Sequence, residues 1–285
     1  MQKITKLEIL RSKVASWRKS DLRIALVPTM GALHEGHLSL VRLAKQYADK
    51  VIVSIFINPT QFNEAADFER YPREEDKDSA LLQAESADLL FLPNVDVMYP
   101  QPFFTTVNVS KVTEDLEGAH RPGHFEGVAT IVTKLLLQSL PDVAVFGEKD
   151  YQQLCLIRNL ARDLNIPTDI IGAPIMRDEE GLALSSRNVF LSDKGLAHAR
   201  QLNKVLYTLA EDLENGRLSF ENLSEEGMRR LISKGLKDID YIELRTADFL
   251  EKVTRDNADQ ELRLLCVVRV DDIRLLDNVA VKPIK

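Results

Sequence analysis

Two histidines spaced three residues apart mark the segment PTMGALHEGH, which covers residues 28–37. The apolar run before this segment is typical of a buried strand, and the residues after it have the apolar spacing of a helix. We therefore expect a strand-to-helix turn, with His34 and His37 on one face of the first helical turn. Unpaired N–H groups at a helix start favour anions, and each neutral imidazole donates one further hydrogen bond. The pattern predicts a phosphate-binding turn in which Gly31 and Gly36 let a ligand approach the backbone closely.

Other interpretations of the histidine pair stay open at this point. Two histidines at a helix start can simply cap the helix or be solvated. A zinc site is a poorer interpretation, because HEGH is not the HExxH motif and the sequence offers no obvious third ligand nearby. The complete order of strand, glycine-containing turn, H-x-G-H and helix resembles the H-x-G-H nucleotidyltransferase superfamily, whose members use ATP to activate carboxylates or phosphates.

Two more polar clusters directly follow apolar runs. Asn58 and Gln61 follow VIVSIF and offer amides that suit a small hydroxy acid, although the Asn-Pro dipeptide can also just end a strand. Lys149 follows DVAVFG and can act as a point charge on a triphosphate. Gln153, one turn into the next helix, can face the same crevice, and Asp150 can cap that helix.

The segment LSSRN, residues 184–188, is a fourth polar cluster. Its hydroxyl groups and the Arg187 guanidinium suit phosphate oxygens, because arginine binds them with a fixed fork geometry. A solvated turn is the alternative. Four such clusters, each at a strand end or a domain junction, are hard to explain as independent accidents.

The elements that must position these clusters alternate along the first part of the chain. Continuous apolar runs predict strands, because strands of a sheet covered on both faces lose the alternation of polar and apolar residues. Stretches with helical spacing lie between them, so we expect an α/β fold with a mostly parallel, doubly wound sheet. Ligands of such sheets bind beyond the carboxyl ends of the strands. The predicted strands are residues 23–28, 51–56, 88–93, 142–147 and 168–176, and the predicted helices are residues 38–48, 74–87, 128–140 and 151–164.

The pattern changes after about Arg187. Two helical stretches, residues 192–215 and 220–234, precede three strand-like runs that predict a small sheet with helices beside it. These runs are residues 238–245, 261–270 and 273–281. We therefore predict two domains, residues 1–176 and a smaller α+β domain of residues 177–285.

The composition limits the classes of function. The chain has 285 residues, of which 45% are hydrophobic, and a formal net charge of -7. An acidic chain argues against non-specific nucleic-acid binding, which depends on neutralising phosphates with Lys and Arg. Cys155 and Cys266 stand in apolar runs and are expected to be buried thiols. The first residues have no signal-peptide pattern, and no apolar run approaches the ~20 residues that span a bilayer, so we expect a soluble, intracellular protein with no membrane partner.

Six segments between residues 28 and 188 resemble, in order and spacing, those of the pantothenate synthetase (pantoate–β-alanine ligase) family. The segments are PTMGALHEGH, NPTQF, YPR, RPGHFEGV, FGEKDYQQ and GLALSSRN. The resemblance implies a Rossmann-like N-terminal domain that binds ATP and pantoate, a smaller C-terminal domain that closes over the active site, and a cytoplasmic homodimer. It also implies that ATP and Mg²⁺ activate pantoate as an acyl-adenylate, which β-alanine then attacks.

The resemblance further implies roles for individual residues. Catalysis is expected of His34, His37, Lys149 and Arg187, with His37 as the proton donor. Pantoate is expected to bind Gln61, Gln153 and Asn58, and β-alanine to bind Gln61. The Mg²⁺ ligands are not predicted. The residues expected to bind ATP are Met30, Gly31, Ala32, Leu33, His34, Glu35, Gly36, His37, Gly147, Glu148, Lys149, Asp150, Met176, Leu184, Ser185, Ser186 and Arg187.

Several alternatives remain open in the sequence. Residues 120–126 are either a loop that closes on pantoate, which we favour, or the start of a helix at His124, and residues 62–71 are a candidate lid. A different H-x-G-H enzyme that transfers AMP to a phosphorylated acceptor would need cations where Gln61 and Gln153 stand. A nucleotide sensor without turnover would not need so many phosphate donors. The C-terminal domain has no motif that matches residue by residue, so its role rests on analogy.

Overall fold

The computed structural model describes residues 1–63 and 65–284, with the side chains of residues 65–67 left aside. Residue 64, within the candidate lid at 62–71, lies outside the described residues, and the helix α3 (Ala65–Arg70) follows it. The chain forms two compact units, and each is described here by itself. The first unit comprises Met1–Glu148 and Leu156–Pro174, and the second comprises Lys149–Cys155 and the residues from Ile175 on.

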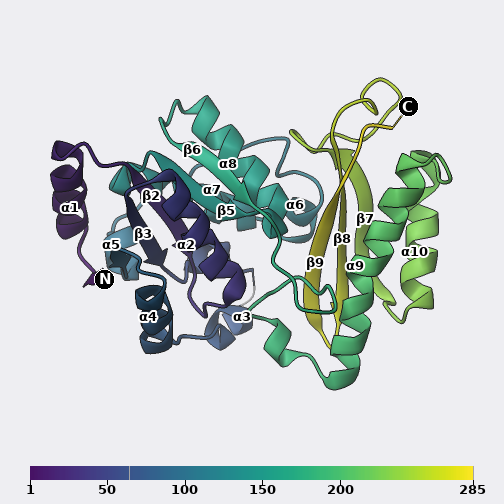
Figure 1. Ribbon diagram of the computed structural model, residues 1–285, viewed down its shortest axis with the longest axis horizontal. Coiled ribbons are helices and arrows are strands. Elements are labelled where there is room, and N and C mark those ends of the chain that lie inside the picture. The colour runs from purple at the N-terminus through teal and green to yellow at the C-terminus, as the bar shows by residue number, and fades with distance from the viewer. Residues whose placement is uncertain (64, 285) are drawn as a thin grey trace. The chain divides into compact units, whose positions relative to one another are not determined.

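The first unit is built on a six-stranded sheet in which every pairing is parallel (Figure 1). The strand order is β1-β4-β3-β2-β5-β6. From β2 the chain continues through β3 and β4 on one side, then returns to β5 on the other, so the direction of winding reverses between β2 and β5. Such a reversal is where doubly wound sheets bind ligands. The strands are β1 (Gln2–Ile4), β2 (Ile24–Thr29), β3 (Lys50–Ile55), β4 (Leu89–Phe91), β5 (Val143–Gly147) and β6 (Asp169–Ala173).

The inner strands of this sheet, β2, β3, β4 and β5, are buried on both faces. Ala25 and Val27 of β2 pack with Leu40, Val41 and Ala44 of a helix on one face, which is why the strand reads as an unbroken apolar run. The helices are α1 (Leu7–Lys19), α2 (Glu35–Tyr47), α4 (Glu75–Ala84), α5 (Val95–Met98), α6 (Glu117–His120), α7 (His124–Ser139) and α8 (Tyr151–Asp163). Two 3-10 turns, η1 (Pro59–Gln61) and η2 (Glu148–Asp150), follow β3 and β5. The α8 helix begins within the second unit and ends within the first.

The second unit is a three-stranded antiparallel sheet with order β7-β8-β9 and two long helices. Asp271 and Asp272, between β8 and β9, both have positive φ (51° and 62°), as the tight turns of two-residue hairpins require. One face of the sheet packs on the helices through a core that includes Leu206, Leu264 and Cys266. The elements are β7 (Asp238–Thr246), β8 (Leu262–Val270), β9 (Ile273–Val281), α9 (Asp193–Glu214), α10 (Leu223–Ser233), η3 (Asn188–Phe190) and η4 (Phe220–Asn222).

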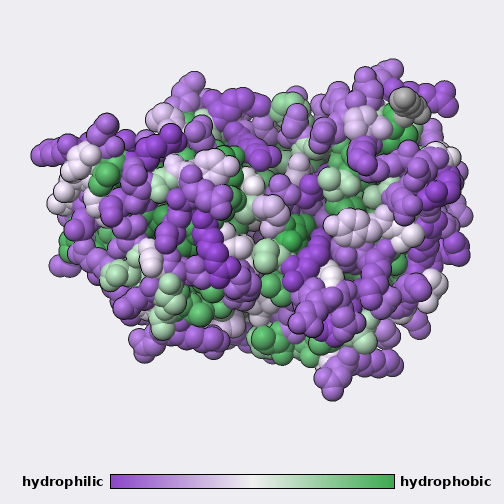
Figure 2. Space-filling model, viewed as in Figure 1, coloured by the Kyte–Doolittle hydropathy of each residue, from purple (hydrophilic) through white to green (hydrophobic). Residues whose placement is uncertain are grey.

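The predicted fold class is confirmed, and each predicted strand and helix has a counterpart within a few residues. The short strand β1 was not predicted, because three residues are too few to show a period. Both cysteines are buried thiols, as expected. In the part of the chain that is described, no helix combines the length and the apolar character needed to cross a bilayer. Hydrophilic residues dominate the face shown in Figure 2, with apolar residues in small patches between them.

The units divide the chain differently from the predicted boundary at residue 176. Residues Lys149–Cys155 group with the second unit rather than the first. The contacts explain why: the Lys149 carbonyl accepts a hydrogen bond from Asn278 Nδ2 (2.9 Å), and the Cys155 thiol donates to the Ala247 carbonyl (3.4 Å). Partners this far apart in sequence leave no local pattern from which the grouping could be read.

Candidate active site

The turn after β2 is held in a left-handed conformation by a buried carboxylate. Gly31 and Ala32 have φ of 87° and 51°. A Cβ at Gly31 would stand 3.0 Å from Asp78 Oδ2. The Asp78 carboxylate, on α4 and 1% exposed, accepts hydrogen bonds from the N–H groups of Ala32 (2.9 Å) and Leu33 (2.8 Å). Burial raises the pKa of the Asp78 carboxyl above its ordinary value of 3.8, although these two backbone hydrogen bonds lower it. Asp78 therefore fixes the shape of the turn that the sequence predicted to bind phosphate.

The two histidines cap α2 reciprocally. His34 Nδ1 accepts a hydrogen bond from the Gly36 N–H (3.1 Å), and His37 Nδ1 accepts one from the His34 N–H (3.4 Å). The ring centroids are 4.1 Å apart. Because both Nδ1 atoms are acceptors, each neutral ring carries its proton on Nε2. The capping interpretation is thus correct, and it is compatible with phosphate binding, because capping uses Nδ1 while Nε2 keeps the N–H.

Glu35 follows His34 in the chain, but its side chain binds Arg42 and not the histidines. Its carboxylate forms an ion pair with Arg42 on the same helix, and Arg42 also binds Glu85. The hydrogen bond from Arg42 lowers the pKa of Glu35. The Glu35 N–H at the first turn of α2 is the group suited to an anion, since helix starts leave such donors without intrahelical partners.

Asn58 organises the η1 turn that carries Gln61. Asn58 is 1% exposed, and its Nδ2 donates to Gln61 Oε1 (3.1 Å) and to the Gly127 carbonyl (3.2 Å). Its Oδ1 accepts hydrogen bonds from the Tyr99 hydroxyl (2.8 Å) and the Thr60 hydroxyl (3.0 Å). Both halves of the Asn58 amide are therefore used within the protein.

Gln61 links the two turns of the first unit. Its Nε2 donates to the sulfur of Met30 (3.1 Å), while its Oε1 accepts from Asn58. The first unit thus brings together two of the segments predicted to carry chemistry: residues 28–37, which form the turn after β2 and the start of α2, and η1. Gly147, the last residue of β5, is also in this unit.

The start of α7 supports the η1 turn at the Gln61 carbonyl. His124 is the first residue of α7, and its Nδ1 lies 2.8 Å from the Gln61 carbonyl oxygen. Arg121 lies 3.1 Å from His124 Nε2 and 3.5 Å from the same carbonyl. A Cβ at Gly127 would stand 2.5 Å from the Thr60 carbonyl oxygen. Of the two interpretations for residues 120–126, the structure has the helix start at His124.

In the second unit, Lys149 lies within η2 and its ammonium is 3.8 Å from Asp150 Oδ1. Gln153 is partly buried in the first turn of α8. Met176, 36% exposed, accepts a hydrogen bond at its carbonyl from the Leu184 N–H (2.9 Å). This bond closes the loop that leads to Arg187.

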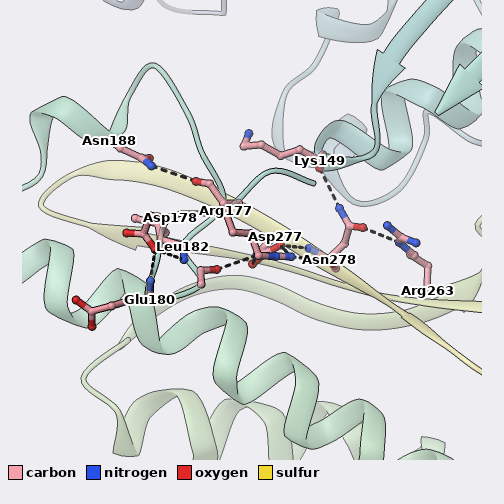
Figure 3. Close-up of polar contacts among 11 residues, drawn as sticks. Lys149, Arg177, Asp178, Glu180, Leu182, Asn188, Arg263, Asp277 and Asn278 are labelled. Atoms are coloured by element: carbon pink, nitrogen blue, oxygen red, sulfur yellow. Dashed lines mark hydrogen bonds and ion pairs between the residues drawn. The ribbon is translucent and has the colours of Figure 1, made fainter. Parts of the chain in front are cut away.

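The segment predicted to bind phosphate in this loop has a defined backbone. Ser185 Oγ accepts from the Arg187 N–H (3.3 Å), and the Asn188 amide donates to the Ala183 carbonyl (3.1 Å) (Figure 3). Ser185, Ser186 and Arg187 are all partly buried. The loop is tied at its base by Arg177, which binds Asp277 through two hydrogen bonds.

Several residues that shape these turns were not predicted, namely Asp78, Tyr99, Gly127, Asp277 and Asn278. Asp78 stands in an acidic helix where nothing local distinguishes it from a solvated carboxylate. The Asp277-Asn278 pair did carry a usable signal, because two polar residues within an apolar strand need partners when buried.

Over residues 1–63 and 65–284, no group of three or more His, Cys, Asp or Glu side chains is arranged to hold a metal ion. A dedicated metal centre is therefore not built from these residues. Mg²⁺ commonly binds through substrate phosphates with one or two carboxylates, and Asp150 beside Lys149 is a carboxylate of that kind. The donor set fits a metal that arrives with a nucleotide.

A doubly wound parallel sheet, whose β2 ends in a left-handed turn and a histidine-capped helix next to the switch point, defines an α/β nucleotide-binding protein of the H-x-G-H class. The sequence comparison makes this class specific. The family model described as pantoate-beta-alanine ligase matches residues 2–280, and the chain belongs to this family.

Several known proteins are similar to this chain over nearly its whole length. The pantothenate synthetase of Paramagnetospirillum magneticum is 50% identical over 274 residues, which cover 96% of this chain and 95% of the relative. The pantothenate synthetase of Mesorhizobium japonicum is 49% identical over 278 residues, which cover 98% of this chain and 97% of that relative. The crystal structure of pantothenate synthetase from Thermus thermophilus has a TM-score of 0.91 at 40% identity, over 99% of this chain and 100% of that chain. A pantoate-beta-alanine ligase from Francisella tularensis, complexed with beta-gamma ATP and beta-alanine, has a TM-score of 0.81 at 35% identity, over 98% and 97%.

Proposed function

We propose that this enzyme condenses pantoate with β-alanine at the expense of ATP, through a pantoyl adenylate. A carboxylate oxygen of pantoate attacks the α-phosphorus of ATP, and pyrophosphate leaves. The amine of β-alanine then attacks the activated carbonyl, the C–O bond to the phosphate breaks, and AMP and pantothenate are released. The observation that carries the proposal is the His34–His37 pair, whose Nδ1 atoms both accept backbone hydrogen bonds, in a chain that matches the ligase family over residues 2–280.

The first unit is assigned to phosphate and pantoate. The Nε2–H groups of His34 and His37 donate to phosphate oxygens as charge moves onto the leaving pyrophosphate, with His37 as the proton donor, because prearranged donors are most effective where charge develops. The backbone from Met30 to His37 lines the nucleotide, and so does Gly147. Gln61 binds the pantoate hydroxyl or carboxylate and lies beside β-alanine.

Asn58 receives a different role from the direct pantoate contact that was expected from its amide in the sequence. Its donors and acceptors are used by Gln61, Gly127, Thr60 and Tyr99. We therefore assign Asn58 to orienting the Gln61 amide, which then contacts pantoate.

The second unit is assigned to the triphosphate and to the other pantoate contact. Lys149 and Arg187 are cations, and Ser185 and Ser186 supply hydroxyl donors, so these four side chains neutralise and position phosphate oxygens. Asp150, Met176 and Leu184 complete the nucleotide contacts of this unit, Met176 through its backbone, and Gln153 holds pantoate. Glu148, the last residue of the first unit before Lys149, is also assigned to the nucleotide. Mg²⁺ enters as part of the ATP substrate, where it offsets phosphate charge.

We also propose that the enzyme is a cytoplasmic homodimer. ATP and buried thiols are both typical of a reducing compartment. Residues 103–109, FFTTVNV, have a strand-like composition but no helix or strand assigned, and Phe104 is 88% exposed. A second copy would cover such a segment by pairing with it. Light scattering of the wild type and Phe104→Asp tests this, since a wild-type monomer would contradict the proposal.

The test of the reaction uses pantoate labelled with ¹⁸O in its carboxylate. The adenylate route transfers one labelled oxygen to AMP, and pyrophosphate release should require pantoate, with sustained AMP formation only when β-alanine is added. Label in inorganic phosphate together with ADP would contradict the adenylate. Pyrophosphate release at the same rate with and without pantoate would contradict pantoate as the substrate. ATP binding without any pyrophosphate release would favour a nucleotide sensor.

A further inference from the structure

Two consecutive residues of β9, Asp277 and Asn278, are buried polar side chains in an otherwise apolar strand. Their exposed fractions are 3% and 2%. Successive side chains of a strand point to opposite faces, so the two residues bind partners on opposite sides of the sheet. The partner of Asp277 is Arg177, at the base of the loop that leads to Arg187, and one partner of Asn278 is Lys149 (Figure 3).

Asp277 ties down the loop that leads to Arg187. Its carboxylate accepts hydrogen bonds from both terminal nitrogens of Arg177, at 2.6 Å and 2.8 Å. Arg177 also donates to the Gly181 carbonyl (3.1 Å), and its backbone pairs with Ala183 in an isolated antiparallel bridge. A bidentate arginine–carboxylate pair restrains direction as well as distance. Asp277 therefore fixes Arg177, and through the Arg177–Ala183 bridge it fixes the loop at a point three residues before Ser186.

Asn278 ties down the main chain at Lys149. Its Nδ2 donates to the Lys149 carbonyl (2.9 Å), and its Oδ1 accepts from Arg263 Nε (2.6 Å). Arg263 is 9% exposed, and its guanidinium carbon stands 4.2 Å from the centroid of the Tyr151 ring. The Asn278–Arg263 pair therefore holds the start of α8 at two points, the Lys149 carbonyl and the Tyr151 ring.

We infer that Asp277 and Asn278 are positioning residues, which set the places of Arg187 and Lys149 for phosphate binding. The inference rests on the proposed function, which assigns those two cations to ATP. Neither β9 residue touches a reacting group, so each acts through the backbone of the segment it holds. Small displacements of a positioned group suffice for a large effect, since a shift of about 1 Å can cost on the order of 100-fold in rate.

The competing explanation is that both residues only stabilise the small sheet, because a buried polar group requires partners wherever it lies. The two explanations differ in their dependence on Lys149 and Arg187. A positioning residue loses its kinetic effect once the cation that it positions is removed, whereas a stabilising residue does not. Coupling of this kind is measured by comparing single and double variants.

The experiment uses Asn278→Asp, which keeps an acceptor for Arg263 but removes the donor to the Lys149 carbonyl. We expect the kcat/KM for ATP in pyrophosphate release to fall by on the order of 10- to 100-fold, with the KM for β-alanine unchanged. In a Lys149→Ala background the same substitution should change kcat/KM less than about twofold. Val279→Ala is the matched control, because Val279 is the next residue of β9, is 3% exposed and packs in the apolar core. It should lower the denaturation midpoint without changing the ATP kinetics.

The Asp277 half of the inference is tested in the same way with Asp277→Asn and Arg187→Ala. If Asn278→Asp does not fold, Arg263→Lys tests the contact from the other partner, because lysine keeps the charge but not the planar stacking on Tyr151. Effects that add fully in the double variants would overturn the positioning role alone, with the phosphate assignment intact. A Lys149→Ala or Arg187→Ala enzyme with wild-type ATP kinetics would instead overturn the phosphate assignment of that cation, and the corresponding half of this inference with it.

Discussion

The ring nitrogen Nδ1 of His37 accepts a hydrogen bond from the backbone N–H of His34, and His34 in turn caps α2 with its own Nδ1. This reciprocal arrangement gives the H-x-G-H motif a structural reason for its spacing. Position N3 of a helix is where a side chain can reach back to the N-cap, so the second histidine must follow the first by three residues. One hydrogen-bonding pattern thus orients both rings and places both protons on Nε2.

Replacing His37 separates capping from phosphate binding. His37→Ala should lower the rate of pyrophosphate release by on the order of 10²- to 10³-fold and the free energy of unfolding by about 1 kcal/mol. His37→Glu keeps an acceptor for the His34 N–H, so its stability should stay near that of the wild type while its rate falls at least as far. Pre-steady-state release and urea denaturation measure the two effects. A glutamate variant with restored rate would show that only the cap matters.

Asn58→Asp tests the assignment of Asn58 to orienting Gln61. The substitution removes the donor to Gln61 Oε1 and to the Gly127 carbonyl and buries a carboxylate beside those oxygens. We expect the free energy of unfolding to fall by about 1–3 kcal/mol and the KM for pantoate to rise several-fold, with little change in the KM for ATP. Tyr99→Phe is the control, since it removes only the hydroxyl that donates to Asn58 Oδ1. Its pantoate KM should stay unchanged, and a rise equal to that of Asn58→Asp would argue against a specific role for Gln61.

Gly127→Ala tests the support of η1 by α7 through steric contact alone. The added methyl group would meet the Thr60 carbonyl oxygen at 2.5 Å and the Gln61 nitrogen at 2.8 Å. Both are backbone atoms, so η1 must move away, and we expect a higher KM for pantoate together with a stability loss of about 1–3 kcal/mol. Glu126→Ala, at the exposed neighbouring position of the same helix, should change neither quantity. Unchanged pantoate kinetics in Gly127→Ala would mean that the position of η1 is not critical.

Asp78→Asn tests the carboxylate that holds the left-handed turn. An amide supplies one acceptor oxygen for two N–H groups, so we expect a loss of about 1–3 kcal/mol in unfolding free energy and slower pyrophosphate release. Asp76→Asn, an acidic neighbour on the same helix, is the control.

The pH dependence of stability gives a second measure of Asp78. Burial raises the folded-state pKa of this carboxyl above 3.8, so between 3.8 and the raised value the folded protein binds more protons than the unfolded chain. Stability from this group must then fall as the pH rises through that window. The difference in unfolding free energy between wild type and Asp78→Asn should therefore shrink as the pH rises there. A difference that grows with pH would contradict the raised pKa.

The positions that could be predicted from the sequence share a local signal. Apolar runs predicted β2, β3 and β5. In a parallel sheet the residues that directly follow such strands, among them His34 after β2 and Gln61 after β3, are expected at the carboxyl edge. Residues that act through distant partners had no such signal. In the sequence, Asp78 cannot be distinguished from any other carboxylate of an acidic helix. Its role in holding the turn after β2 is visible only in its hydrogen bonds from Ala32 and Leu33.

The domain boundary illustrates the same limit. Residues Lys149–Cys155 continue smoothly from a strand into a helix, so local periodicity assigned them to the first domain. Their grouping with the second unit depends on Asn278 and Ala247, which the helical pattern cannot reveal. The unit to which residues 149–155 belong is set by contacts between residues far apart in the sequence, which propensity and periodicity do not register.

The contact between Lys149 and Asn278 also orders events during translation. The two residues are 129 positions apart, and Arg177 and Asp277 are 100 apart. At about 5–20 residues per second, a ribosome needs several seconds to make the strand that fixes either segment after the segment itself has been made. Under the proposed function, the two segments assigned to phosphate are therefore anchored only after β9 has been made.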